Sequence, residues 1–164
     1  IKLIFDNILV AYNDGYNEEA RRNMLHASYK AGIAFSKSYV GYVHAIAHTL
    51  GGKYNIPHGL ANSIILPYVL EAYGSKIYKK LYKISLHLGL VDENESYEEG
   101  AKAFINAIKY LNKSMNIPTK VLELKEEDIK LLAKFADKEA NPLYPVPLLM
   151  DAKELENLYR LLLV

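Results

Sequence analysis

Residues 41–62 read GYVHAIAHTLGGKYNIPHGLAN and contain three of the five histidines of the chain. His44 and His48 are four residues apart, so on a helix their side chains lie on one face, one turn apart. The paired glycines that follow indicate the end of that helix. His58 then stands at the opening of the next helix. Converging neutral imidazoles suit Zn²⁺ or Fe²⁺, and the segment therefore predicts a metal site built on two successive helices.

The rest of the chain also predicts helices, and no run alternates as a half-buried strand would. Asn17 is followed by two acidic residues and is typical of an N-cap. Two capping boxes are expected, Ser96 with Glu99 and Asp151 with Glu154. The expected helices cover residues 1–12, 18–36, 39–50, 58–73, 76–89 with Ser75 as its cap, 97–115, 125–140 and 152–164. We therefore expect an all-α fold.

Composition limits the class of protein. The 164 residues are 51% hydrophobic and 24% charged, which fits one globular domain with a real core. A net charge of +1 argues against a nucleic-acid surface, which needs clustered positive charge. No apolar run approaches the ~20 residues of a membrane span. The absence of cysteine excludes disulfides and thiolate ligands and fits a reducing cytoplasm, so we expect a cytoplasmic protein.

The histidine motifs resemble a known family. Residues 31–73, with His-Ala-Ile-Ala-His and Pro-His-Gly-Leu-Ala-Asn, resemble the signature region of the iron-containing alcohol dehydrogenases, and residues 1–14 and 139–147 resemble the same family. The resemblance implies the helical C-terminal domain of the dehydroquinate synthase-like, iron-containing alcohol dehydrogenase fold. No Gly-rich phosphate loop follows a strand. We therefore expect residues 1–164 to be a single helical metal-binding domain, a fragment of a two-domain enzyme whose N-terminal nucleotide-binding domain is absent.

The resemblance also implies roles for individual residues. It makes His44 and His58 metal ligands for Fe²⁺ or Zn²⁺, with an aspartate and a histidine upstream of Ile1 completing the set. It places His48 beside the metal, near the nicotinamide of NAD or NADP and the reacting alcohol, as a catalytic proton relay. Spacing alone would instead make His48 a co-ligand of His44. Phe35 matches an aromatic residue that lines the nicotinamide pocket in relatives, and its alternative is an ordinary core residue.

Two tyrosines depart from the commoner family pattern. Tyr39 and Tyr42 stand near positions where many relatives have small or aliphatic residues. They either narrow the substrate pocket or pack against the fold. His26 and His87 have no motif around them, and we assign them no function.

The expected activity of the full-length enzyme is the NAD(P)-dependent interconversion of an alcohol and an aldehyde or ketone by hydride transfer. The isolated chain is expected to be inactive, and relatives are often dimers or larger. One alternative is a dehydroquinate synthase-like or glycerol dehydrogenase-like metal domain. In dehydroquinate synthases, however, the His-Gly pair is usually followed by Glu, whereas His58-Gly59 is followed by Leu60. The other alternative is a non-catalytic helical interaction domain.

Overall fold

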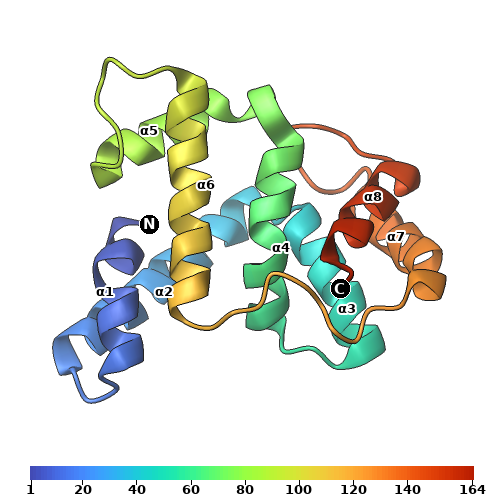
Figure 1. Ribbon diagram of the computed structural model, residues 1–164, viewed down its shortest axis with the longest axis horizontal. Coiled ribbons are helices and arrows are strands. Elements are labelled where there is room, and N and C mark those ends of the chain that lie inside the picture. Colours follow the sequence, from blue (N-terminus) through green and yellow to red (C-terminus); the bar gives the residue numbers. More distant parts are fainter. The chain divides into compact units, whose positions relative to one another are not determined.

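The computed structural model describes residues 1–164, and it contains helices and no strands (Figure 1). The α-helices are α1 (Lys2–Asn13), α2 (Glu18–Ser38), α3 (Tyr42–Tyr54), α4 (His58–Tyr73), α5 (Tyr78–Leu88), α6 (Tyr97–Ser114), α7 (Glu126–Ala140) and α8 (Ala152–Leu162), with a short 3₁₀ turn, η1 (Gly74–Lys76). The expected all-α class is therefore confirmed. None of these helices combines the length and the apolar composition that a membrane crossing requires.

The chain divides into two compact units. One consists of residues 1–39 and 78–115, and the other of residues 40–77 and 116–164. In the first unit α1 packs on α2 and α5 packs on α6. The rings of Phe5 and Phe104 stack there with centroids 5.8 Å apart. The second unit contains all three histidines of the 41–62 segment.

The predicted helix caps are present. The side chain of Asn17 accepts a hydrogen bond from the backbone N–H of Ala20 at 2.9 Å. Ser96 and Glu99 form a reciprocal capping box at the start of α6. A second capping box, made by Asp151 with its partner three residues later, opens α8. Each cap satisfies backbone donors that the first turn of a helix leaves unpaired.

Two predicted boundaries are wrong. Helix α3 does not end at its paired glycines but continues to Tyr54, and Asn55 ends it in the left-handed region at φ 56°. The reason is tertiary, because the Tyr54 hydroxyl donates to Asp128 Oδ2 at 2.7 Å and holds the last turn of α3 against α7. Ser75 does not cap a long helix either. It lies inside the η1 turn, and α5 starts at Tyr78.

Gly100 marks the closest approach of α5 and α6, and this contact supports the first prediction. A Cβ at Gly100 would lie 2.4 Å from Cδ2 and 3.0 Å from Cα of Tyr82. Because the Cα belongs to the backbone, α5 would have to shift, and we expect Gly100→Ala to lower the free energy of unfolding by about 1–3 kcal/mol. Urea titration of the variant would measure this. Gly32→Ala is the matched control in the middle of α2, where nothing lies within 4 Å.

For Gly32→Ala the expected sign is opposite. Alanine is favoured over glycine in a helix interior by about 0.5–1 kcal/mol, so this control should raise the stability. Equal effects of the two substitutions would show that helix propensity, and not the packing of α5 on α6, decides the result at Gly100.

In the second unit, α3 packs against both α4 and α7, while α8 packs on α7 and also contacts α4. Tyr159 of α8 is completely buried, and its hydroxyl forms a hydrogen bond with the hydroxyl of Thr49 on α3. Tyr42, at the start of α3, is also completely buried. These contacts fix the helix that carries His44 and His48.

Candidate metal centre

Three imidazole rings meet in the second unit. His44 and His48 lie on α3, and His58 is the first residue of α4. The ring centroids of His44 and His58 are 5.4 Å apart, those of His48 and His58 5.3 Å, and those of His44 and His48 6.1 Å. The structure thus brings together the three histidines that the sequence singled out.

The link between α3 and α4 explains why His58 lies against the histidines of α3. Asn55 adopts the left-handed conformation that ends α3, and Ile56, the next residue of the link, is buried. Pro57 then precedes the first residue of α4 with φ −54°, a value already suited to a helix start. Three residues therefore suffice to return the chain alongside α3.

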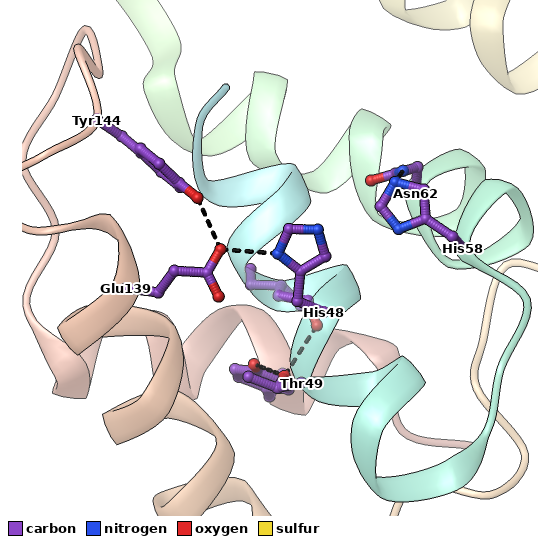
Figure 2. A network of polar contacts seen from close by, with 8 residues as sticks. His48, Thr49, His58, Asn62, Glu139 and Tyr144 are labelled. Atoms are coloured by element: carbon purple, nitrogen blue, oxygen red, sulfur yellow. Dashed lines mark hydrogen bonds and ion pairs between the residues drawn. The ribbon is translucent and has the colours of Figure 1, made fainter. Parts of the chain in front are cut away.

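Asn62 orients the His58 ring from one turn further along α4. Its side-chain Nδ2 donates to His58 Nε2 at 2.8 Å (Figure 2). Because Nε2 accepts this bond, its lone pair is directed at Asn62, and a cation could bind at Nε2 only in place of this hydrogen bond. The Oδ1 atom of Asn62 is buried and has no hydrogen-bond partner.

Burial lowers the pKa of His44, and the neighbouring His58 and His48 lower it further, while Glu139 acts in the opposite direction. The lowered pKa favours the neutral imidazole. Only this form has the free lone pair that a metal ion needs.

A hydrogen-bonded chain leads away from His48 (Figure 2). His48 Nδ1 lies 2.7 Å from Oε1 of Glu139 on α7, and the hydroxyl of Tyr144 donates to the same oxygen at 2.8 Å. The side chain of His48 is 44% exposed and that of Glu139 is 32% exposed, so the contact is open to small molecules on one side. Burial and the adjacent carboxylate of Glu139 raise the pKa of Tyr144 to about 12.

An open groove of about 360 Å³ begins at His48 and Glu139. The apolar part of its lining consists of Leu131, Leu132 and Phe135 from α7. Neither His44 nor His58 lines this groove.

The donor set fits part of a metal site. His44 and His58 supply two neutral nitrogen donors, and no set of three or more His, Cys, Asp or Glu side chains in this chain is arranged to hold a metal ion alone. Catalytic zinc sites have three protein ligands and an open position, so two imidazoles leave room for oxygen or nitrogen donors from elsewhere. The residues present therefore agree with an N/O site shared with another part of the protein.

The other sequence candidates belong to the first unit or pack inside the second. Phe35 is on α2 in the first unit and is 53% exposed, so its reading as an ordinary core residue is wrong. Tyr42 packs inside the second unit, whereas Tyr39 is 68% exposed. His26 and His87 belong to the first unit, whereas the motif with the other three histidines belongs to the second.

Sequence reasoning missed Glu139 and Tyr144 as parts of the site. In the sequence, residues 139–147 stand out only as a segment that resembles the family. No periodicity links residue 139 to His48, which is 91 positions earlier. The sequence signal for Glu139 is an acidic residue in the family-resembling segment 139–147, just before a Pro-rich loop.

Comparison with known proteins agrees with this geometry. The sequence model described as the Fe-containing alcohol dehydrogenase family, C-terminal, matches residues 1–163. The chain is 42% identical to alcohol dehydrogenase 4 of Saccharomyces cerevisiae over 144 residues, which are 85% of this chain and 36% of that protein. It is 36% identical to 1,3-propanediol dehydrogenase of Citrobacter freundii over 162 residues, or 98% of this chain and 42% of that protein.

Solved structures give the same result. A crystal structure of a 1,3-propanediol oxidoreductase superposes with a TM-score of 0.91 at 35% identity and covers 97% of this chain. The alcohol dehydrogenase of Oenococcus oeni superposes with a TM-score of 0.91 at 31% identity and covers 98% of this chain. In both cases the match spans 42% of the longer chain. The helical fold and the sequence are those of the C-terminal domain of this family, and the chain belongs to the Fe-containing alcohol dehydrogenase family.

Proposed function

We propose that this chain is the metal-binding domain of an NAD(P)-dependent alcohol dehydrogenase that interconverts an alcohol with an aldehyde or ketone. The single observation that carries the proposal is the convergence of His44, His48 and His58, with ring centroids 5.3–6.1 Å apart. The relatives matched above are longer, which supports a second, nucleotide-binding domain as the partner of this one. The absence of cysteine supports a cytoplasmic location.

In this proposal His44 and His58 are ligands of Fe²⁺ or Zn²⁺. The family resemblance implies that an aspartate and a histidine outside this chain complete a four-coordinate set. When bound, the metal would supply Lewis-acid polarisation of the substrate oxygen. The lowered pKa of His44 favours its neutral form, which is the form that ligates a metal.

His48 has a different role in the proposal. Its Nδ1 is occupied by Glu139, and its other nitrogen is free to take the proton that the alcohol loses. Phe35 is proposed to contact the nicotinamide ring, as the family resemblance implies.

The test is alcohol oxidation by the protein, purified both as this chain and as the whole product of its gene. We expect the whole product, loaded with Fe²⁺ or Zn²⁺, to reduce NAD⁺ or NADP⁺ with a primary alcohol or a diol. Chelation should abolish the reaction, and added metal should restore it. The 164-residue chain alone should be inactive.

The proposal would be wrong if the metal-loaded whole product bound neither nicotinamide nucleotide and oxidised no alcohol. A His87→Ala variant is the matched control, since His87 lies on α5 and is not part of the three-histidine motif. It should retain the full activity.

A further inference from the structure

Glu139 determines which nitrogen of His48 carries a hydrogen. An ionised carboxylate only accepts hydrogen bonds, and Oε1 of Glu139 lies 2.7 Å from His48 Nδ1. Nδ1 must therefore be the N–H that donates. In the neutral ring this leaves Nε2 with a lone pair, because a neutral imidazole carries one hydrogen.

The direction of that lone pair follows from the same contact. The two nitrogens lie on different edges of the ring, so fixing Nδ1 on Glu139 turns Nε2 away from α7. Figure 2 shows this nitrogen of His48 on the side where His58 lies. The rings of His48 and His58 are stacked, with an interplanar angle of 19°. The free nitrogen of His48 is thus held beside the proposed metal ligand.

Glu139 is itself held in place. The Tyr144 hydroxyl donates to the same Oε1 at 2.8 Å, and the Tyr144 backbone N–H donates to the carbonyl of Ala140 at 2.8 Å. The raised pKa of Tyr144, about 12, keeps its hydroxyl a donor at physiological pH. At the end of α7, Asn141 Nδ2 also donates to Asp137 Oδ1 at 2.7 Å, which stabilises the last turn of this helix. Glu139 therefore does not depend on His48 for its position.

We propose that Glu139, seated by Tyr144, is a positioning residue for His48. It fixes the tautomer with hydrogen on Nδ1 and turns Nε2 towards the reacting alcohol, where it accepts the proton of the hydroxyl group. The proton-accepting part rests on the proposed dehydrogenase function. The tautomer and the ring direction stand on the structure of this chain alone. Nothing in the histidine motif indicates Glu139, because the residue comes from a separate helix.

The first experiment reads the tautomer directly. Metal-free protein labelled with 15N-histidine is recorded by NMR at mildly alkaline pH, where an ordinary imidazole is neutral, and the His48 signals are assigned by their loss in His48→Asn. We expect hydrogen on Nδ1 in the wild type and a shift of the population towards hydrogen on Nε2 in Glu139→Ala. Glu139→Gln should keep the Nδ1 tautomer, since its amide oxygen still accepts from Nδ1–H.

The second experiment reads the rate in the metal-loaded whole protein. Outer partners of metal ligands typically contribute 10- to 100-fold to metal affinity or activity, and we expect a partner of His48 to contribute similarly, so Glu139→Ala should lower kcat by about that factor. The KM for the alcohol should change little, because Glu139 acts through His48. Tyr144→Phe should have a smaller effect in the same direction. Glu127→Ala, an exposed carboxylate in the first turn of the same helix, is the matched control and should leave kcat unchanged.

The outcomes separate the two proposals. Hydrogen on Nε2 of His48 in the wild type, or an unchanged tautomer and an unchanged kcat in Glu139→Ala, would overturn the positioning role. A wild type that oxidises no alcohol, combined with loss of the Nδ1 tautomer in Glu139→Ala, would overturn the proposed function and support Glu139 as the residue that orients His48.

Discussion

Replacing His58 by alanine is expected to lower the affinity of the protein for Fe²⁺ or Zn²⁺ by more than about 100-fold. The basis is that loss of an outer partner of a metal ligand already costs 10- to 100-fold, and loss of a ligand itself should cost more. His58 opens α4 and faces His44 at 5.4 Å between ring centroids, so its removal leaves one imidazole of the proposed pair. Metal content after dialysis against buffered metal would measure the loss.

The fold should survive this substitution. The side chain of His58 is exposed, and its hydrogen bond to Asn62 is made within one turn of α4. We expect thermal unfolding of the metal-free variant to match that of the metal-free wild type closely. His44→Ala should lose metal in the same way, whereas His87→Ala should bind metal normally. Normal metal binding by both His44→Ala and His58→Ala would contradict the assignment of these residues as ligands.

The second large effect is expected at Tyr42, where Tyr42→Ala should lower the free energy of unfolding by about 3–5 kcal/mol, as truncation of a fully buried aromatic residue does. Its hydroxyl lies 2.9 Å from Asn141 Oδ1 and accepts from the backbone N–H of Met150 at 2.9 Å. Tyr42→Phe keeps the ring but leaves the buried N–H of Met150 without its partner. This variant should lose about 1–3 kcal/mol.

Guanidinium titration of both Tyr42 variants would give these values. Tyr29→Ala is the control, because Tyr29 is 72% exposed on α2, and a surface substitution of this kind usually changes stability by less than about 0.5 kcal/mol. If Tyr42→Ala were as mild as the control, the start of α3 would not depend on its anchor to the segment before α8.

The helix starts that depend on residues close together in the sequence were predicted correctly. Asn17, Ser96 and Asp151 begin helices because a short polar side chain reaches backbone donors two or three residues later, and this is visible in sequence. The rule failed at the paired glycines of α3, since glycine permits a helix end without requiring one. There Tyr54 makes its decisive hydrogen bond with a residue 74 positions away.

The same difference between near and distant partners applies to the residues of the candidate site. His44, His48 and His58 were found because they share one motif, whereas Glu139 was not, because its partner is far away in sequence. The sequence allows either a pocket role or a packing role for Tyr42, and its complete burial supports the packing role. Periodicity reports which face of a helix is buried but not which distant side chain lies against it.

The distance in sequence between two contacting residues also affects the order in which their contacts form during folding. His44 and His58 belong to adjacent helices joined by three residues, so closing the loop between them costs little chain entropy. The hydrogen bond from His48 to Glu139 spans 91 residues and requires α7 to have docked. In refolding, we therefore expect the pair of proposed ligands to meet early, while the acceptor nitrogen of His48 is aligned among the last contacts.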